Sequence, residues 1–158
     1  MTIRYAVPDD VPAVSAVEAE CFPPATAAEF AERVAHYGNH FWLMYNGDKL
    51  ISFVDGFVTD DADLTDEMYE NAAMHNEHGA WQMIFGVNTL PAYRQHGYAG
   101  KLLQKAIADA KEQGRKGLVL TCKSRLVHYY AKFGFVDEGV TDKSTHGNVA
   151  WHQMRLTF

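Results

Sequence analysis

The most constraining feature of the sequence is an apolar run that passes through a glycine-containing turn directly into a strongly periodic helix. The run Trp81–Thr89 has the length and composition of a strand that is buried on both faces. From Ala99 onward, apolar side chains recur at helical spacing while lysines and acids occupy the opposite face, and Gly114 is well placed to end the helix. Strand, turn and helix therefore follow one another, and the turn lies where the strand ends.

The turn between strand and helix runs from Pro91 to Lys101 and combines glycines, small residues and basic side chains. The start of a helix presents backbone N–H groups without a partner in the helix, together with a partial positive charge, so it favours a pyrophosphate. Small residues let the phosphates approach the backbone. The turn therefore predicts an anion-binding loop, although a turn that merely needs glycine is the plainer interpretation of so short a segment.

Two other kinds of phosphate loop do not match this segment. A P-loop requires Gly where Gln95 stands and Ser or Thr where Leu102 stands, and the dinucleotide fingerprint requires three spaced glycines where only Gly97 and Gly100 are available. The residues Arg94-Gln95-His96-Gly97-Tyr98-Ala99 instead resemble the acetyl-CoA loop of the GNAT superfamily of N-acetyltransferases. In that loop, Arg or Gln is followed after two residues by Gly, any residue, and then Gly or Ala.

A second match lies beyond the periodic helix. Gly117–Cys122 is another strand-like apolar run, and Leu126–Phe135 contains a tyrosine followed by a Lys-Phe-Gly-Phe turn. In GNAT enzymes a helix after this strand carries a tyrosine near the coenzyme sulfur, and Tyr130 occupies that position. Leu120–Cys122 and Glu20–Phe22 further resemble the arylalkylamine (serotonin) N-acetyltransferase branch and its bacterial relatives. The matches extend over most of the chain.

The resemblance implies a single GNAT acetyltransferase domain over residues 1–158, of the α/β (α+β) class. Its mixed, mostly antiparallel sheet of six to seven strands would be splayed at its centre, between Trp81–Thr89 and Gly117–Cys122. About four helices would flank the sheet.

Local patterns predict the remaining elements. Asn46-Gly47-Asp48 between two apolar runs predicts a β-hairpin. The polar stretch Thr59–Gly79 predicts a surface excursion that contains a short helix near Asp66–Ala73. The other expected strands and helices are the strands Ile3–Val7, His40–Tyr45, Lys49–Val58 and Val149–Leu156, and the helices that begin after Asp10 and around Ala27.

Residue-by-residue matching to the family implies a coenzyme site. Pantetheine would be bound by the backbone of Val87, Asn88 and Thr89, and an N–H near Val87 would stabilise the oxyanion. The pyrophosphate would be surrounded by Arg94, Gln95, His96, Gly97, Tyr98, Ala99 and Gly100. Tyr130 would protonate the leaving thiolate, because a phenol with a pKa of about 10 stays protonated at neutral pH. An aromatic stripe of the core is the alternative interpretation of Tyr130.

The proton acceptor is where the sequence departs from the family. Vertebrate arylalkylamine enzymes place two histidines on the central strand, whereas Met83 and Phe85 occupy those positions here. Substitutes by residue type are His75, His78, Glu20 and Asp55. The acceptor pocket would combine aromatic walls with carboxylates, and its candidate residues are Phe22, Phe41, Trp42, Phe57, Met68, Tyr69 and Trp81 beside Asp55 or Glu67.

The composition indicates which kinds of molecule the protein can bind. Fourteen basic and 20 acidic residues give a net charge of −6, which argues against nucleic-acid binding and suits a cationic substrate. Cys21 and Cys122 indicate neither a disulfide scaffold nor a zinc site, and His75 and His78 lack a clear third ligand for any metal. The sequence shows neither a signal-peptide pattern nor an apolar run of membrane-spanning length.

These observations together predict a cytoplasmic, metal-free enzyme that is a monomer or a homodimer. It would transfer acetyl from acetyl-CoA to the primary amine of a small molecule, arylalkylamine or polyamine-like, by direct attack in a ternary complex. A non-catalytic acyl-CoA-binding or regulatory domain is one alternative. A protein N-terminal or lysine acetyltransferase is another, because one fold can host many acceptors.

Overall fold

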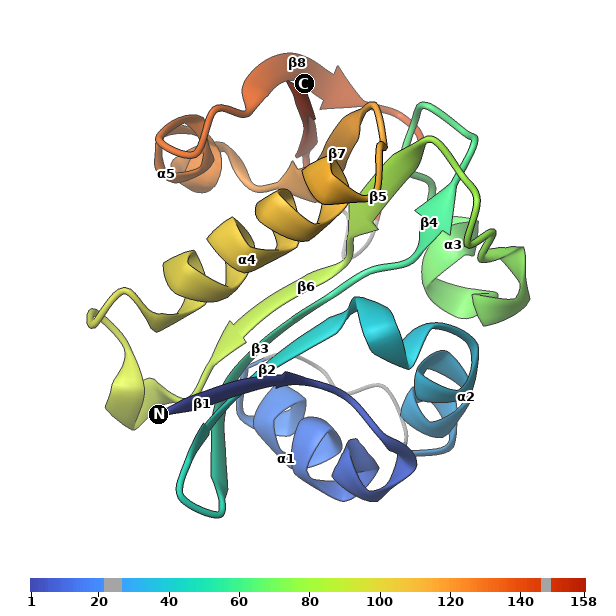
Figure 1. Cartoon of the computed structure of the whole chain (residues 1–158). Helices are drawn as coiled ribbons and strands as arrows, with labels where there is room; N and C mark the ends of the chain where they lie inside the picture. Colours follow the sequence, from blue (N-terminus) through green and yellow to red (C-terminus); the bar gives the residue numbers. More distant parts are fainter. Residues whose placement is uncertain (22–26, 146–148) are drawn as a thin grey trace. The chain divides into compact units, whose positions relative to one another are not determined.

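The computed structural model describes residues 1–21, 27–145 and 149–158. The chain forms two compact units, each built around one β-sheet (Figure 1). The first unit comprises Met1–Gly56 and Gly86–Ala106, and the second comprises Phe57–Phe85 and Ile107–Phe158.

Strands alternate with helices and short 3-10 turns along the chain. In chain order the elements are β1 (Thr2–Tyr5), η1 (Pro8–Asp10), α1 (Val11–Cys21), α2 (Ala27–Tyr37), η2 (Gly38–His40), β2 (Phe41–Asn46), β3 (Lys49–Asp55), β4 (Val58–Thr59), α3 (Asp66–Glu70), η3 (Ala72–Met74), β5 (Trp81–Ile84), β6 (Gly86–Thr89), η4 (Pro91–Tyr93), α4 (Tyr98–Glu112), β7 (Gly117–Cys122), η5 (Ser124–Leu126), α5 (Val127–Ala131), β8 (Val136–Thr141) and β9 (Trp151–Thr157).

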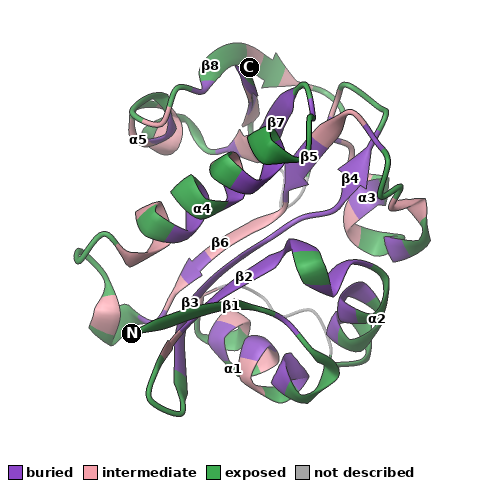
Figure 2. Cartoon of the chain, viewed as in Figure 1, coloured by how far each residue is buried: buried purple, intermediate pink, exposed green. Residues whose placement is uncertain are grey.

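The first unit contains a four-stranded antiparallel sheet in the order β1-β2-β3-β6. The predicted hairpin is confirmed, because Asn46 opposes Lys49 and Gly47 adopts a φ of 59° in the turn. Helix α1 packs on β3 and β6, and Phe30 of α2 meets Phe53 of β3 at a ring separation of 6.2 Å. Strand β3 is buried along almost its whole length (Figure 2).

The second unit contains a five-stranded sheet in the order β4-β5-β7-β9-β8. Strands β5 and β7 are parallel, and the other pairs are antiparallel. At Gly117 an added β-carbon would lie 1.9 Å from the carbonyl oxygen of Leu156, so only glycine fits where β7 meets β9. Helix α5 packs on β8 and β9.

The prediction of a mixed, mostly antiparallel sheet is confirmed, but several strand bounds were wrong. The predicted strand Trp81–Thr89 divides at Phe85 into β5 and β6, which belong to different sheets. The predicted strand Lys49–Val58 also divides, because β3 ends at Asp55 in the first sheet and Val58–Thr59 form β4, which pairs with β5 in the other sheet. Strand β8 was not predicted, since its valines are exposed.

The predicted surface excursion Thr59–Gly79 is only partly a surface segment. Leu64 and Met68 are fully buried within it, and helix α3 covers the first part of the predicted short helix. Within the described ranges, no helix has both the length and the apolar character needed to cross a bilayer.

Candidate functional site

Strand β6 forms one edge of the first unit's sheet, and its register decides which backbone groups stay open. The N–H of Leu90 donates to the carbonyl of Ile51 at 2.9 Å. Because hydrogen-bonded pairs alternate along an antiparallel ladder, Asn88 also directs its backbone groups toward β3. Val87 and Thr89 therefore direct theirs to the open side of the sheet, as an extended ligand with amide groups would require.

Helix α4 begins directly after this strand and its turn. The first backbone bond of the helix runs from the N–H of Lys101 to the carbonyl of Gly97, at 3.1 Å. The N–H groups of Tyr98, Ala99 and Gly100 precede that bond and have no acceptor within the helix. They stand at the positive end of a helix of 15 residues, which favours an anion at this point.

The loop before α4 bends through two residues with positive φ, 67° at Gln95 and 76° at Gly97. Glycine adopts this conformation without strain, whereas Gln95 does so at some cost. The ring of His96 stacks on that of Tyr98, with 5.4 Å between the centroids. The loop is exposed from Arg94 to Gly97, so its backbone is open to a ligand.

The side chain of Arg94 folds back onto strand β6. Its Nε donates to the carbonyl of Thr89 at 3.1 Å, and a terminal nitrogen lies 3.6 Å from the sulfur of Cys21. Arg94 thus holds the loop against the end of the strand. The sulfur of Cys21 in turn lies 3.5 Å from the carbonyl of Thr89, and this contact supplies no base that could activate the thiol.

Tyr130 lies on α5 in the second unit and is 7% exposed. Its ring packs edge-on against Tyr129, at 5.1 Å between centroids, and against Phe135, at 6.3 Å. Burial raises the pKa of Tyr130 above its usual value, and the nearby Tyr129, Cys122 and Tyr69 raise it further. The hydroxyl therefore keeps its proton at neutral pH, as a proton donor must.

Of the four predicted proton acceptors, His75 has both ring nitrogens engaged, and His78 and Glu20 are exposed. The Nδ1 of His75 accepts a hydrogen bond from the N–H of Val58 at 3.0 Å, and its Nε2 lies 3.1 Å from a carboxylate oxygen of Glu77. Both ring nitrogens of His75 are thus engaged in holding the second unit together.

Asp55, the fourth candidate, has a different environment. It ends β3, is 2% exposed, and lies opposite Gly86 in the register of the sheet. Its Oδ2 has no hydrogen-bond partner among the described residues. Burial raises the pKa of Asp55 to about 7, Arg33 acts to lower it, and Glu18 raises it further. A carboxyl with this pKa can exchange a proton at physiological pH.

Most of the residues predicted to line the acceptor pocket belong to the hydrophobic core. The buried candidates are Phe41, Trp42, Phe57 and Met68. Tyr69 and Trp81 are partly exposed, and the guanidinium of Arg155 covers the ring of Trp81 at 4.6 Å. Glu67 is exposed, and Phe22 lies outside the described residues.

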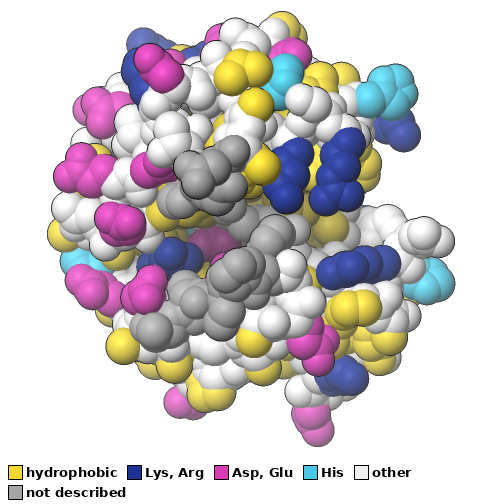
Figure 3. All heavy atoms as spheres, turned by 180° about the vertical axis from the view of Figure 1, so that it is seen from behind, with side chains coloured by type: hydrophobic (Ala, Val, Ile, Leu, Met, Phe, Trp, Pro, Cys, Tyr) yellow, Lys and Arg dark blue, Asp and Glu magenta, His cyan; other side chains and the backbone are white. Residues whose placement is uncertain are grey.

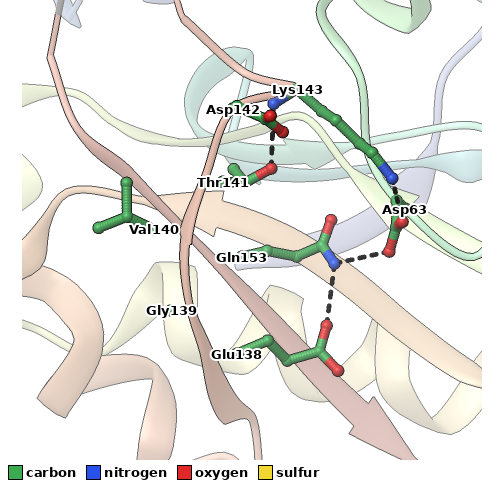
Figure 4. A pocket seen from close by; sticks show the side chains of 8 residues that line it. All are labelled: Asp63, Glu138, Gly139, Val140, Thr141, Asp142, Lys143 and Gln153. Carbon is green, nitrogen blue, oxygen red and sulfur yellow. Dashed lines mark hydrogen bonds and ion pairs between the residues drawn. The ribbon is translucent and has the colours of Figure 1, made fainter.

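A separate polar cavity of about 500 Å³ lies beside strand β8 (Figure 4). The amide nitrogen of Gln153 donates to Asp63 and to Glu138, at 2.9 Å in each case. The ammonium of Lys143 lies 2.5 Å from the other oxygen of Asp63. Because these charged groups satisfy one another, the cavity is explained as a structural network of the second unit.

Comparison with known proteins identifies the family. A model of the acetyltransferase (GNAT) family matches residues 11–135, which is most of the chain. No curated protein matches this chain in sequence. The chain therefore belongs to the acetyltransferase (GNAT) family, and it is an acyltransferase that depends on acetyl-CoA.

Solved structures agree with this fold. The loading GNATL domain of CurA from Lyngbya majuscula has a TM-score of 0.83 at 14% identity, with 99% of this chain and 96% of that chain covered. The GphF GNAT-like decarboxylase in complex with isobutyryl-CoA has a TM-score of 0.83 at 21% identity, with 99% of each chain covered. The ribosomal-protein-S18-alanine N-acetyltransferase from Escherichia coli has a TM-score of 0.70 at 18% identity, with 99% and 92% covered. The predicted fold class is confirmed.

Proposed function

We propose that this enzyme transfers the acetyl group of acetyl-CoA to the primary amine of a small molecule, arylalkylamine or polyamine-like, by direct attack in a ternary complex. One observation carries the proposal. The open backbone groups of β6 lead within a few residues to the free amides at the start of α4. Acetyl-CoA needs both features, because its pantetheine arm carries amides and its nucleotide end carries a pyrophosphate.

The residues divide the binding of acetyl-CoA between them. Val87 and the N–H of Thr89 offer backbone groups to pantetheine, whereas the carbonyl of Thr89 already accepts from Arg94, and the N–H of Val87 is the donor for the oxyanion. The amides of Tyr98, Ala99 and Gly100 bind the pyrophosphate, and the exposed loop before them completes its surroundings. The proposed binding uses no metal ion.

The reaction needs a proton donor as well as a bound thioester. The amine attacks the carbonyl carbon in its neutral form, a C–N bond forms, and the C–S bond breaks as the oxyanion collapses. The leaving thiolate takes the phenolic proton of Tyr130, and the phenolate recovers a proton from the amide nitrogen. Tyr130 is protonated at neutral pH, and its burial raises the pKa, so the thiolate must form close to the hydroxyl to take this proton.

The surface charge favours a cationic acceptor. The chain carries a net charge of −6, and acidic side chains gather on part of the face drawn in Figure 3. The sequence motifs resemble the arylalkylamine branch, whereas the comparisons support only the family. The Escherichia coli neighbour acts, by its name, on the alanine of a ribosomal protein, so a protein N-terminus is the competing acceptor.

The test measures thiol release from acetyl-CoA with phenylethylamine, tryptamine, spermidine, a lysine peptide and an alanine-terminated peptide. We expect turnover with a small amine, and we expect Tyr130→Phe to lower kcat by about 10²- to 10⁴-fold. Tyr129→Phe is the matched control, because Tyr129 is the neighbouring phenol of the same helix and should change kcat only slightly.

The other outcomes assign the function differently. Turnover confined to the peptides would replace the small-molecule acceptor with a protein acceptor. Binding of acetyl-CoA without turnover on any amine would indicate an acyl-CoA-binding domain. Equal rates in the two phenylalanine variants would remove Tyr130 from the proton-donor role.

A further inference from the structure

Two buried polar side chains share one face of the β3–β6 pair. In register, Asp55 lies opposite Gly86 and Asn88 lies opposite Phe53, so both polar side chains point to the face where Phe53 meets helix α2. Asp55 is 2% exposed and Asn88 is 1% exposed. Among the described residues, Oδ2 of Asp55 and both amide atoms of Asn88 have no hydrogen-bond partner. Buried polar atoms without partners are rare and point to a missing ligand or water.

Gly86 lets these two side chains lie directly against the backbone of β6. A β-carbon at this position would lie 2.7 Å from Oδ1 of Asp55 and 2.9 Å from Nδ2 of Asn88. Any other residue would push one of the polar groups away. The next residue along β6 is Val87, the proposed oxyanion donor, so the polar pair lies beside the strand segment where the thioester is proposed to bind.

Three titratable groups of helices α1 and α2 interact with Asp55. Arg33 of α2 is the guanidinium that acts on Asp55, and Glu18 of α1 adds a second carboxylate. Tyr37 of α2 also faces this group, since the charge of Asp55 contributes to raising the pKa of Tyr37. Oδ2 of Asp55 and Oδ1 of Asn88 are both acceptors without a donor among the described residues, and an ammonium group is a ligand that can donate to both.

We infer that Asp55, with Asn88 beside it, binds the ammonium group of the acceptor and accepts the proton that the amine must lose, directly or through one water. This inference rests on the proposed function. It assigns the proton acceptor to Asp55, whereas the vertebrate arylalkylamine enzymes place two histidines on the central strand. The ammonium nitrogen starts with three protons. One passes to Asp55 and later to solvent, one neutralises the leaving thiolate through the proposed acid, and one remains on the amide.

The experiment uses Asp55→Asn, which keeps the shape of the side chain and removes its charge. We expect kcat/KM for the amine at pH 7 to fall about 10²- to 10⁴-fold, while the Kd of acetyl-CoA changes less than about twofold. The wild-type profile of kcat/KM should rise with pH through about 7, and the variant should lose this rise. Calorimetric binding of the amine to the CoA-bound protein should also weaken at least tenfold.

Stability reports the raised pKa of Asp55 independently of catalysis. Folding raises the pKa of Asp55 from its ordinary 3.8 to about 7, so the wild-type protein loses stability as pH rises through this range. Asp55→Asn should therefore melt at a higher temperature than wild type at pH 8, and at a similar temperature at pH 4. Gly86→Ala, which keeps both polar groups but pushes one of them away from the strand, should cause the same loss of amine binding.

The failures can be told apart. Wild-type turnover with an unchanged rate and pH profile in Asp55→Asn would overturn the inference and leave the proposed function standing. If the wild-type protein and Asp55→Asn bind the amine with equal affinity, the inference is overturned even where no turnover is seen. If no amine binds to the wild-type protein or is acetylated by it, the proposed function falls and the inference falls with it.

Discussion

Two buried aspartates of the first unit show how partners decide the role of a carboxylate. Asp10, which is 3% exposed, accepts hydrogen bonds from Arg4 and Tyr45 at 2.7 Å each and from the N–H of Val7 at 2.9 Å. Asp55 is as deeply buried, but one of its oxygens has no partner among the described residues. The first carboxylate therefore stabilises the fold, and the second has an oxygen that the proposed amine could use.

Asp10→Asn should destabilise the protein by about 1–3 kcal/mol at pH 7, because the buried carboxylate loses its charge-assisted hydrogen bonds while the exposed Arg4 stays solvated. Burial acts to raise the pKa of Asp10, but bonds from Arg4, Val7 and Tyr45 outweigh it and lower the pKa. The stabilisation is therefore present above a pH of about 4 and is lost as the pH falls through the lower folded value. Urea unfolding at pH 7 and pH 3 measures the difference, and equal stabilities at pH 7 would contradict this account.

The sequence predicts the role of Asp10 better than that of Asp55. Asp10 follows Pro8-Asp9 at the start of a helix, which is a local signal for a capping carboxylate. Asp55 precedes Gly56, and an Asp-Gly pair normally indicates a surface turn. Its burial depends on β6 and on helices α1 and α2, which lie far from it in sequence. Residue type alone could therefore make Asp55 a candidate, but only the structure separates it from His75.

At the scale of elements, helix α4 provides a matched pair of glycines. Gly97 before the helix has a φ of 76° and Gly114 after it has a φ of 78°, and a β-carbon at either would meet nothing within 4 Å. Alanine at either position should cost about 1 kcal/mol of stability through backbone strain alone.

Only Gly97→Ala should also weaken the binding of acetyl-CoA, because relief of the backbone strain at this position would turn the amides at the start of α4 away from the pyrophosphate. We expect its Kd for acetyl-CoA to rise about tenfold or more, a change of 1.4 kcal/mol in binding. Gly114→Ala should leave the Kd unchanged, which calorimetry can establish. A similar shift in both variants would mean that general destabilisation, and not the loop, explains the effect.

The elements that could be predicted are those whose ends are marked by short sequence patterns. The hairpin at Gly47 and the helix that ends before Gly114 carry turn and capping signals in a few residues. The break at Phe85 lies inside an apolar run without a turn residue, so it depends on which strands pair on either side. Strand β8 carries exposed valines and acids, which form no alternating pattern that a sequence could show.

For the whole molecule, acetyl-CoA should act as a stabilising ligand. At a concentration of 100 times its Kd, a ligand that binds only the folded state adds about 2.7 kcal/mol. For a chain of 158 residues this corresponds to a rise in Tm of about 5–10 °C. Thermal unfolding with acetyl-CoA, and with adenosine as a control that lacks the pyrophosphate, measures the effect. A rise of the same size with adenosine would contradict binding through the loop.

The open side of β6 has a further consequence for the behaviour of this protein in solution. A strand edge with free N–H and C=O groups is a template on which another extended chain can pair, and such edges promote self-association. Val87 and the N–H of Thr89 present such groups whenever the coenzyme is absent. Acetyl-CoA would then serve as a protective cover as well as a substrate, and preparations kept with CoA should stay clear and monodisperse for longer than preparations stripped of it.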